Sequence, residues 1–453
     1  MSFDFEKLKQ ISDMRAVQLG LWLVLFAEGL LAIWLSRPWI SGDSSYYLEL
    51  GKSVCHGRYG SFTAAGFQPD VLRPPGYPVL LCALRHGLSL PIPAIVLLQL
   101  GAYLLSIFVL TRVLVRRGYS PTLMLLLAIA YPASIMYGTQ IMTEAWTQVA
   151  LAVAVLVLER GGLGTRALLL AGLLCGLAAY FRSDLLPVPI FLAIAVLIEQ
   201  LRSKAPVVRS VGRTALPVIA AAVLLLPYAV WNEVNFKWPL PAPLASAVGT
   251  SVYLATWQEK LPNDELAALY HGILTPRAKS LGLGDEVRAI NERVGADPLT
   301  APWSPTDYAT NAQRIEVNRA TAEMAMRRIR DDPSGYVDHV LGNIWRLWQA
   351  NALPSSVPSI AVILIQTASW LIFIFGSVGM ALSLVRPRNW PLSAAPAAIL
   401  LTVPIVHIWL HTEARYTAAV RPILLLLAAT AMYWLADTYL SRKPGRADTA
   451  PSA

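Results

Sequence analysis

The chain has 453 residues, of which 55% are apolar and 14% are charged, and its mean hydropathy is +0.51. These values exclude an ordinary soluble domain, because such a domain needs many more charged residues to cover its surface. The formal net charge of +9 does not indicate nucleic-acid binding, because the basic residues form neither a stripe nor a patch with interleaved aromatic residues. The composition therefore predicts a membrane protein.

Apolar runs recur along the whole chain. A hydrocarbon core about 30 Å thick is crossed by roughly 20 apolar helical residues, and by this rule the sequence predicts about ten transmembrane helices. The first runs from about residue 16 to 36, and later ones lie near 93–115, 120–136, 143–159, 166–181, 185–201, 214–232, 358–385, 391–410 and 417–438.

The basic residues cluster in the short connections between these runs. The clusters are Lys7, Lys9 and Arg15; Arg112, Arg116 and Arg117; Arg202, Lys204, Arg209 and Arg213; Arg386 and Arg388; and Arg442, Lys443 and Arg446. Positive residues favour the cytoplasmic side, so one consistent topology places every cluster and both termini there. The sequence then divides into a transmembrane module (1–232), an outer-face segment (233–356), a second transmembrane module (357–440) and a cytoplasmic tail (441–453).

The first outer loop, residues 37–92, is expected to carry two short amphipathic or interfacial elements. The segment SGDSSYYLELGKSV predicts a helix that begins near Asp43 and lies on the bilayer surface. Residues 76–90 are apolar but too short to span the bilayer, so we expect them to be interfacial or re-entrant.

Three cysteines occur, and none has the spacing of a metal site. Cys175 falls inside a predicted span, where packing is its expected role. Cys55 and Cys82 both fall in the first outer loop, so the sequence permits a disulfide between them but leaves its formation open.

The segment 233–356 has the composition of a soluble helical subdomain. PNDELAALYHGIL predicts one helix, and a longer helix is expected to end at Asp332, directly before Pro333. Trp345 and Trp348 are expected to anchor the chain at the membrane interface, where aromatic residues are enriched.

Polar residues from five separate regions are predicted to share the outer membrane face. They are Asp43, Arg73, Glu144, Arg182, Asp184, His411, Glu413, Arg415 and Tyr416. Ionisable groups are costly when they face lipid, so these side chains are expected to line an aqueous cavity. A cavity that combines carboxylates with arginines suggests a site for an anionic lipid headgroup.

Five motifs follow one another in a fixed order: GDSSYY after the first span, then RPPGYPVLLCAL, TEAW, FRSD and EARYTAAVRP. In this order they resemble the GT-C membrane glycosyltransferases that use polyprenyl-phosphate sugars, whose members include protein O-mannosyltransferases and lipid A aminoarabinose transferases. The resemblance covers most of the transmembrane portion, while 233–356 matches only loosely, through IRDDPSGYV.

The resemblance implies an all-α membrane fold of the GT-C type and an inverting transfer of a sugar from a polyprenyl-phosphate donor to a hydroxyl of an envelope lipid, glycan or protein. It implies that Asp43 is the general base, since a base must reach the acceptor hydroxyl directly. The donor phosphate is assigned to arginines, because guanidinium groups bind phosphate bidentately: Arg73, Arg182 and Arg415. Tyr46 and Tyr77 are expected to line the cavity with the other polar residues. The expected location is a bacterial inner membrane, with the site facing the periplasm.

The chain departs from the pattern of the family it resembles in having GDSS where many members have two adjacent acidic residues. The acceptor and any metal therefore do not carry over from the family. His56, His411 and Glu413 could bind a divalent ion, but no pair of them has ligand spacing on one helix face. No cofactor is required by the sequence, and a divalent metal is possible but not favoured.

Structural roles compete with each functional assignment. Asp43 could cap its helix, Glu144 and Arg182 could form a structural ion pair, and Arg415 with Tyr416 could anchor the last helix at the interface.

Two other classes of protein remain as alternatives. A transporter or lipid flippase would show half-repeats, broken spans and charges near the bilayer midplane, whereas here the charges cluster at one face and Glu28, within the first span, is the exception. The second alternative is a non-catalytic subunit of an envelope assembly complex, which the presence of Asp43 disfavours.

Overall fold

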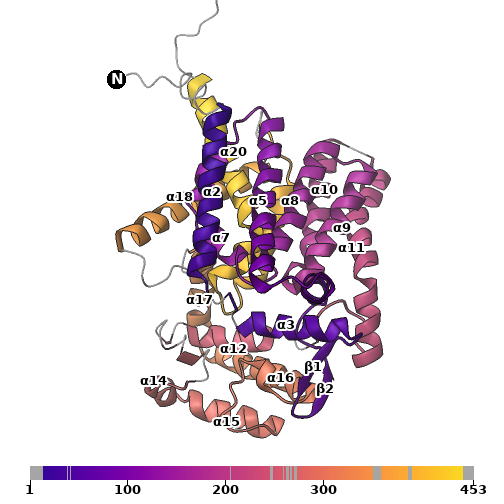
Figure 1. Ribbon diagram of the computed structural model, residues 1–453, viewed down its shortest axis with the longest axis vertical. Coiled ribbons are helices and arrows are strands. Elements are labelled where there is room, and N and C mark those ends of the chain that lie inside the picture. The colour runs from indigo at the N-terminus through magenta and orange to yellow at the C-terminus, as the bar shows by residue number, and fades with distance from the viewer. Residues whose placement is uncertain are drawn as a thin grey trace, which may run out of the picture.

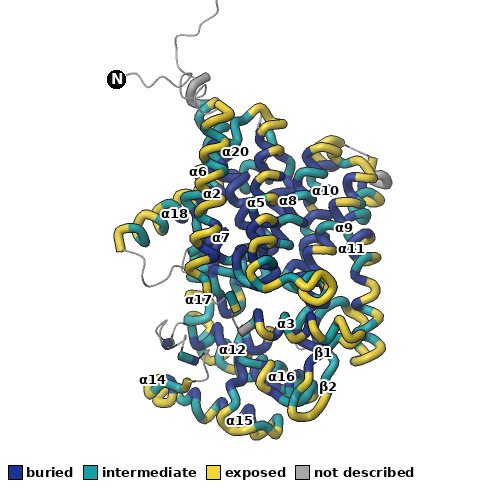
Figure 2. The backbone as a smooth tube through the Cα atoms, in the orientation of Figure 1, coloured by how far each residue is buried: buried dark blue, intermediate teal, exposed yellow. Residues whose placement is uncertain are grey.

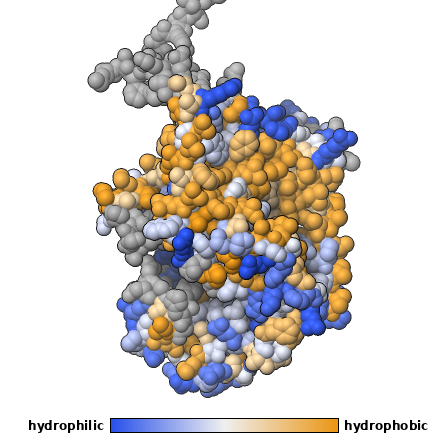
Figure 3. Space-filling model, in the orientation of Figure 1, coloured by the Kyte–Doolittle hydropathy of each residue, from blue (hydrophilic) through white to orange (hydrophobic). Residues whose placement is uncertain are grey.

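The computed structural model describes residues 14–441, except residues 38, 41, 205, 245–247, 259, 262–264, 266–267, 270–272, 350–358 and 386–389. The structure is about 76% helical. A bundle of long helices stands above a smaller body formed by α3 (Gly42–Cys55), a β-hairpin (residues 60–69) and the helices described between residues 248 and 346 (Figure 1). Apolar residues cover the visible face of the bundle and hydrophilic residues gather over the smaller body, as expected where one part lies in lipid and the other in water (Figure 3).

Among the described residues, six helices are long and apolar enough to cross a membrane. They are α2 (Arg15–Leu35), α5 (Ile92–Arg116), η2 with α10 (Ser183–Arg202), α11 from Ser210 to Phe236, α18 (Ser359–Val385) and η4 with α20 (Ala414–Thr438). Two shorter apolar helices, α9 (Thr165–Phe181) and α19 (Ala395–His407), lie where spans were expected. An all-α membrane protein is therefore confirmed in outline, and the number of ten crossings stays a prediction.

The two remaining expected spans differ from the others. The helix α8 (Glu144–Gly161) forms where a span was predicted, but it carries the charged residues Glu144 at its start and Glu159 and Arg160 near its end. The crossing expected at 120–136 is not one continuous helix, because this segment forms two short helices, α6 (Thr122–Ile129) and α7 (Ala133–Gly138). Pro132 separates them, since proline lacks an amide hydrogen and disfavours a helical residue before it.

The described chain begins and ends at the same end of the bundle. The start of α2 and the end of α20 lie together, whereas α3 and the hairpin lie at the opposite end, which we call the subdomain end (Figure 1). This arrangement agrees with termini on one membrane face. Several predicted basic clusters fall outside the described residues: Lys7 with Lys9, Arg386 with Arg388, and the group after residue 441.

Close helix packing in the bundle depends on glycine. Gly172 and Gly176 of α9 face Pro217 and Ala221 of α11, and a Cβ atom at Gly172 would overlap the Pro217 backbone. Small residues four apart allow two helix backbones to approach closely, which is the usual basis of helix association in lipid. The tube in Figure 2 shows the interior of the bundle as buried and the outward sides of α9 and α11 as partly exposed.

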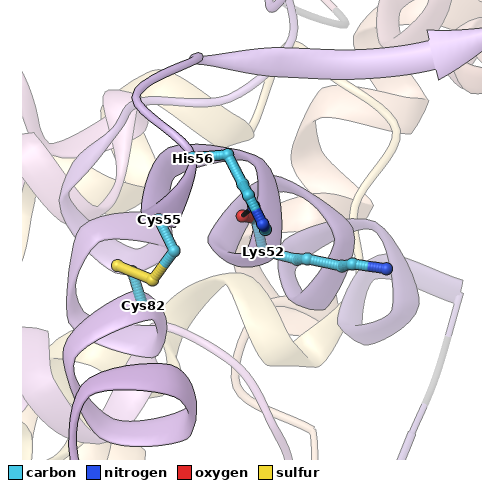
Figure 4. Close-up of a disulfide and its surroundings, with 4 residues drawn as sticks. All are labelled: Lys52, Cys55, His56 and Cys82. Atoms are coloured by element: carbon cyan, nitrogen blue, oxygen red, sulfur yellow. Dashed lines mark hydrogen bonds between the residues drawn. A yellow bond between two sulfur atoms is a disulfide. The ribbon is translucent and has the colours of Figure 1, made fainter.

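The first outer loop contains the predicted amphipathic helix, α3 (Gly42–Cys55), and a short helix, α4 (Gly76–Leu81), which continues as a π-helical segment (Cys82–Gly87) where an interfacial or re-entrant element was expected. Between them lies an antiparallel hairpin of β1 (Gly60–Thr63) and β2 (Gly66–Pro69), which the sequence analysis did not predict. A disulfide joins Cys55 to Cys82, whose Cα atoms are 5.4 Å apart, and so fixes the end of α3 to α4 (Figure 4).

The helical subdomain comprises α12 (Val248–Gln258), α14 (Pro276–Ser280), α15 (Leu283–Val294), η3 (Pro305–Asp307), α16 (Asn311–Asp331) and α17 (Pro333–Arg346). It has its own apolar core, which includes Tyr253, Trp257 and Val317. A capping box of Thr310 and Gln313 starts α16, and Asp332 ends it and accepts a hydrogen bond from the Gly335 amide at the start of α17. The predicted end of the long helix at Asp332 is therefore confirmed, while most of PNDELAALYHGIL lies outside the described residues.

Candidate functional site

A cavity of about 560 Å³ lies between the bundle and the helical subdomain. Its walls come from α3, the loop before α4, the starts of α8 and α10, the segment before α12, the η3 region and the chain between α19 and α20. All of these elements meet at the subdomain end. The cavity therefore gathers polar side chains that lie far apart in sequence, among them Asp43 and Arg415, which are separated by 372 residues.

The carboxylate of Asp43 is held between two arginines. Arg73 Nη2 donates to Oδ1 at 2.5 Å and Arg415 Nη1 donates to Oδ2 at 2.8 Å. The Arg73 charge, opposed by burial and assisted by Arg415, holds the Asp43 pKa well below its usual range. Asp43 lies inside α3 and turns both oxygens toward the arginines, so its contacts are those of a charged site residue rather than of a helix cap.

Arg415 connects Asp43 to a second carboxylate. Its Nε donates to Glu413 Oε2 at 2.7 Å, while the guanidinium carbon lies 5.6 Å from the centre of the Tyr416 ring. The Arg415 side chain is only 27% exposed. These contacts aim Arg415 into the cavity and differ from those of an arginine that extends to lipid headgroups at the edge of a bundle.

A second ionic group also lines the cavity. Arg182 donates from Nη1 to Glu144 at 2.7 Å and from Nη2 to Asp184 at 2.8 Å, and His407 Nε2 lies 3.0 Å from the same Asp184 oxygen. The structural pairing of Glu144 with Arg182 is therefore present. Because two carboxylates pair with Arg182, less of its charge remains for a phosphate than in Arg73, whose ion pair among the described residues is with Asp43 alone.

His411 provides a neutral polar group. Burial lowers the pKa of His411 to about 4, so that the imidazole is uncharged at neutral pH. Its backbone N–H donates to the Ser251 carbonyl at 2.8 Å, which ties the chain before η4 to α12 of the helical subdomain.

Nine of the eleven predicted site residues line the cavity, and Tyr46 and Tyr77 do not. The Tyr46 hydroxyl donates to Asp70 on the other side of α3, and the Tyr77 hydroxyl donates to Gln99 at 3.1 Å in the bundle core. Tyr47 lines the cavity instead, because it lies one helical turn after Asp43 on the same face of α3.

The sequence analysis also missed His407 and Trp303, which both line the cavity. His407 stacks on the Tyr416 ring with centroids 4.6 Å apart, and its position four residues before His411 is a helical spacing that could have indicated it. Trp303 has no comparable signal, since it belongs to an irregular stretch before η3.

No group of three His, Cys, Asp or Glu side chains suited to a metal ion occurs in the part of the chain that the structure describes. His56, one of the three residues considered for a metal, lies beside the disulfide and contacts the Lys52 carbonyl at 2.8 Å (Figure 4). It therefore lies apart from His411 and Glu413 of the cavity. Metal dependence stays open to measurement.

No protein-family model and no curated protein matches the chain. Similar solved structures include three of the oligosaccharyltransferase of Archaeoglobus fulgidus, a GT-C protein. The complex with an inhibitory peptide and a dolichol-phosphate is 16% identical with a TM-score of 0.46, and the match covers 95% of this chain and 52% of that one. The apo form is 14% identical with a TM-score of 0.47, and the match covers 92% of this chain and 51% of that one. The form tethered to an acceptor peptide is 15% identical with a TM-score of 0.47, and the match covers 94% of this chain and 50% of that one.

The chain thus spans about half the length of these neighbours. They belong to the GT-C superfamily that the sequence motifs resemble. At this level of similarity the activity of this chain has to be argued from the geometry of its own cavity.

Proposed function

We propose that the protein is an inverting glycosyltransferase that moves a sugar from a polyprenyl-phosphate donor to a hydroxyl of an envelope lipid, glycan or protein. One observation carries this proposal. A carboxylate on the first outer loop, Asp43, is held by two arginines inside a cavity between an apolar bundle and a hydrophilic subdomain. Such a cavity is suited to a substrate with a lipid tail, an anionic linkage and a polar head.

In the proposed reaction, Asp43 accepts the proton of the acceptor hydroxyl. The acceptor oxygen attacks the anomeric carbon, its proton passes to the Asp43 carboxylate, and the bond from the anomeric carbon to the phosphate oxygen breaks with its electrons on the phosphate. No strong acid is required, because the leaving phosphate is a stable anion.

The two arginines suit the leaving group. Each offers Asp43 one terminal nitrogen, and the Arg73 and Arg415 side chains remain 31% and 27% exposed, so further N–H groups can bind phosphate. A guanidinium that contacts the carboxylate on one edge and the phosphate on another places them roughly 6–7 Å apart, by summing two hydrogen bonds and the group's own width. This separation leaves room for a sugar between them, as the carboxyl pairs of inverting glycosidases leave room for water.

Binding of the donor also raises the basicity of Asp43. While Asp43 faces two arginine charges it is a weak base, because their field stabilises the carboxylate. A phosphate bound to Arg73 and Arg415 neutralises part of that charge and makes the carboxylate more basic. The base is therefore strongest when the donor is present, which suits ordered binding with the donor first.

The proposed location is a bacterial inner membrane, with both termini in the cytoplasm and the cavity at the periplasmic face. The disulfide supports this placement, because such bonds persist in oxidising compartments such as the periplasm. The proposed partners are the lipid-linked donor, the acceptor and the bilayer, without nucleic acid. No cofactor is invoked.

The test compares the wild type with Asp43→Asn, an isosteric change that removes the base, using a panel of polyprenyl-phosphate sugars and an envelope extract. Glu49→Gln is the matched control, because Glu49 lies on the same helix but on its exposed side. We expect Asp43→Asn to lose transfer by at least a hundredfold, the range of general base catalysis, while Glu49→Gln stays active. An active Asp43→Asn removes Asp43 from the chemistry. A wild type inactive with every donor contradicts the transferase and favours a transporter.

A further inference from the structure

Asp70 lies outside the cavity, three residues before Arg73, and its side chain is saturated with hydrogen bonds. It is 1% exposed. The Tyr46 hydroxyl donates to Oδ1, while Oδ2 accepts from the Tyr59 hydroxyl at 3.1 Å and from the backbone N–H groups of Leu72 and Arg73 at 3.3 and 2.8 Å. A buried carboxylate that accepts this many hydrogen bonds holds the surrounding loop in one conformation.

The carbonyl of Arg73 is held as well. The Tyr59 hydroxyl lies within hydrogen-bond distance of it, and the Tyr228 hydroxyl donates to it at 3.4 Å from α11 of the bundle. The Tyr59 hydroxyl has one proton, so it serves either the Asp70 carboxylate or the Arg73 carbonyl at a given moment. The main chain of Arg73 is therefore held at its amide by Asp70 and at its carbonyl by two tyrosines.

The same loop is attached to the helical subdomain. Asn311, at the start of α16, donates from its side chain to the Pro69 carbonyl at 2.6 Å and from its backbone to Gln68 Oε1 at 3.1 Å. Thr63 at the hairpin turn donates to the Ala309 carbonyl at 2.5 Å. Asp70 directly follows this docked hairpin, so it joins the subdomain on one side to Arg73 on the other.

We propose that Asp70 and Tyr59 are a positioning pair. They hold the Arg73 backbone so that its guanidinium contacts both Asp43 and the donor phosphate. The inference rests on the proposed function, because that function includes the binding of the donor phosphate by Arg73 and Arg415. An arginine on an irregular loop has many side-chain and backbone states, and a misplacement of about 1 Å in a reacting geometry costs as much as a hundredfold in rate. Hydrogen bonds to both ends of the Arg73 residue remove the backbone part of that freedom.

Two tyrosines provide a matched test. Tyr59→Phe and Tyr46→Phe each remove one hydroxyl from the Asp70 carboxylate and keep the ring, but only Tyr59 also reaches Arg73. We expect Tyr59→Phe to raise the donor KM roughly fivefold, the effect of about one hydrogen bond, with the acceptor KM unchanged. Tyr46→Phe should leave both KM values within about twofold and lower the melting temperature as much as Tyr59→Phe does.

Equal effects of the two variants on the donor KM would overturn the proposal, because they would show a general loss of loop stability. Hydrogen exchange of the Leu72 and Arg73 amides gives a readout that does not depend on turnover. Faster exchange in Tyr59→Phe than in Tyr46→Phe supports the positioning role, and equal exchange opposes it. If the wild type transfers no sugar, the proposed function fails, and the exchange rates alone still decide the role of the pair.

Discussion

Asp43 and His411 show how one cavity sets two side chains in different charge states. Both pKa values are lowered, the first mainly by the Arg73 charge and the second by burial. A lowered pKa keeps a carboxylate ionised and an imidazole neutral, so the two groups differ in charge although their pKa values shift in the same direction. The cavity thus presents a fixed anion beside an uncharged hydrogen-bonding ring.

This difference predicts the pH dependence of the free enzyme. Asp43 stays deprotonated and His411 stays neutral above a pH of about 4, the pKa of His411, so neither titrates between pH 5 and 7. We expect kcat/KM for the donor to be flat over that interval, in the wild type and in His411→Gln. The measurement is a pH profile of both proteins. An acid limb near pH 6 that is present in the wild type and missing in His411→Gln would mean that the ring is charged.

The sequence indicated most charged residues of the cavity because ionisable side chains at the ends of apolar spans need water. It could not distinguish Tyr46 from Tyr47, since the choice depends on how α3 is rotated against the bundle. Asp70 was missed because its side-chain partners, Tyr46 of α3 and Tyr59 directly before β1, are 24 and 11 residues away in sequence and are brought to it only by the fold. Glu28 has no assigned role: it lies in α2, and its buried Oε2 has no hydrogen-bond partner among the residues that the structure describes.

At the level of elements, the length of the apolar runs predicted the positions of the long helices well. Breaks within those runs were not predicted. The spans that became α2, α5, α11 and α18 have continuous apolar runs, so their positions were predicted closely. The break between α6 and α7 follows from Pro132, a signal that the run of apolar residues concealed. The hairpin in GSFTAAGFQP was missed because its strands have four residues each and lack a regular apolar alternation.

The packing of α9 on α11 yields a stability prediction. Gly172→Leu would drive a side chain into the Pro217 backbone, and overpacking of this kind costs about 1–3 kcal/mol. We expect a lower melting temperature in detergent. Gly101→Leu on α5 is the control, because a Cβ there meets no atom within 4 Å, and it should leave the melting temperature nearly unchanged. Equal melting temperatures for the two variants would contradict the close approach of the helices.

At the scale of the whole molecule, two bodies of different polarity meet at the cavity. The bundle has an apolar surface and the helical subdomain a hydrophilic one (Figure 3), and the charge clusters in the sequence predicted which end faces outward. The composition of residues 233–356 predicted a helical subdomain, but the contacts of this segment with the first loop could not be foreseen. Those contacts join residues near 68 to residues near 311, and no local pattern indicates a pairing over that distance.

The predicted topology can be tested with single cysteines. Asp285→Cys lies on the helical subdomain at a site that is 83% exposed, and Arg166→Cys lies at the exposed start of α9 at the opposite end of the bundle. We expect a membrane-impermeant maleimide to label Asp285→Cys in intact cells and Arg166→Cys only after permeabilisation. Native cysteines should not interfere, because Cys55 and Cys82 are joined and Cys175 is buried. The reverse labelling pattern would invert the topology.

The disulfide also makes part of the first loop a closed covalent ring. The ring runs from Cys55 to Cys82 and contains Tyr59, Asp70 and Arg73, while Asp43 lies outside it on the helix that leads in. Any one cut of the backbone within the ring leaves the two pieces joined through sulfur, with each end still attached to a helix. Arg73, one of the two arginines proposed to bind the donor phosphate, and its supports Tyr59 and Asp70 thus belong to a piece of chain that a single proteolytic nick cannot release.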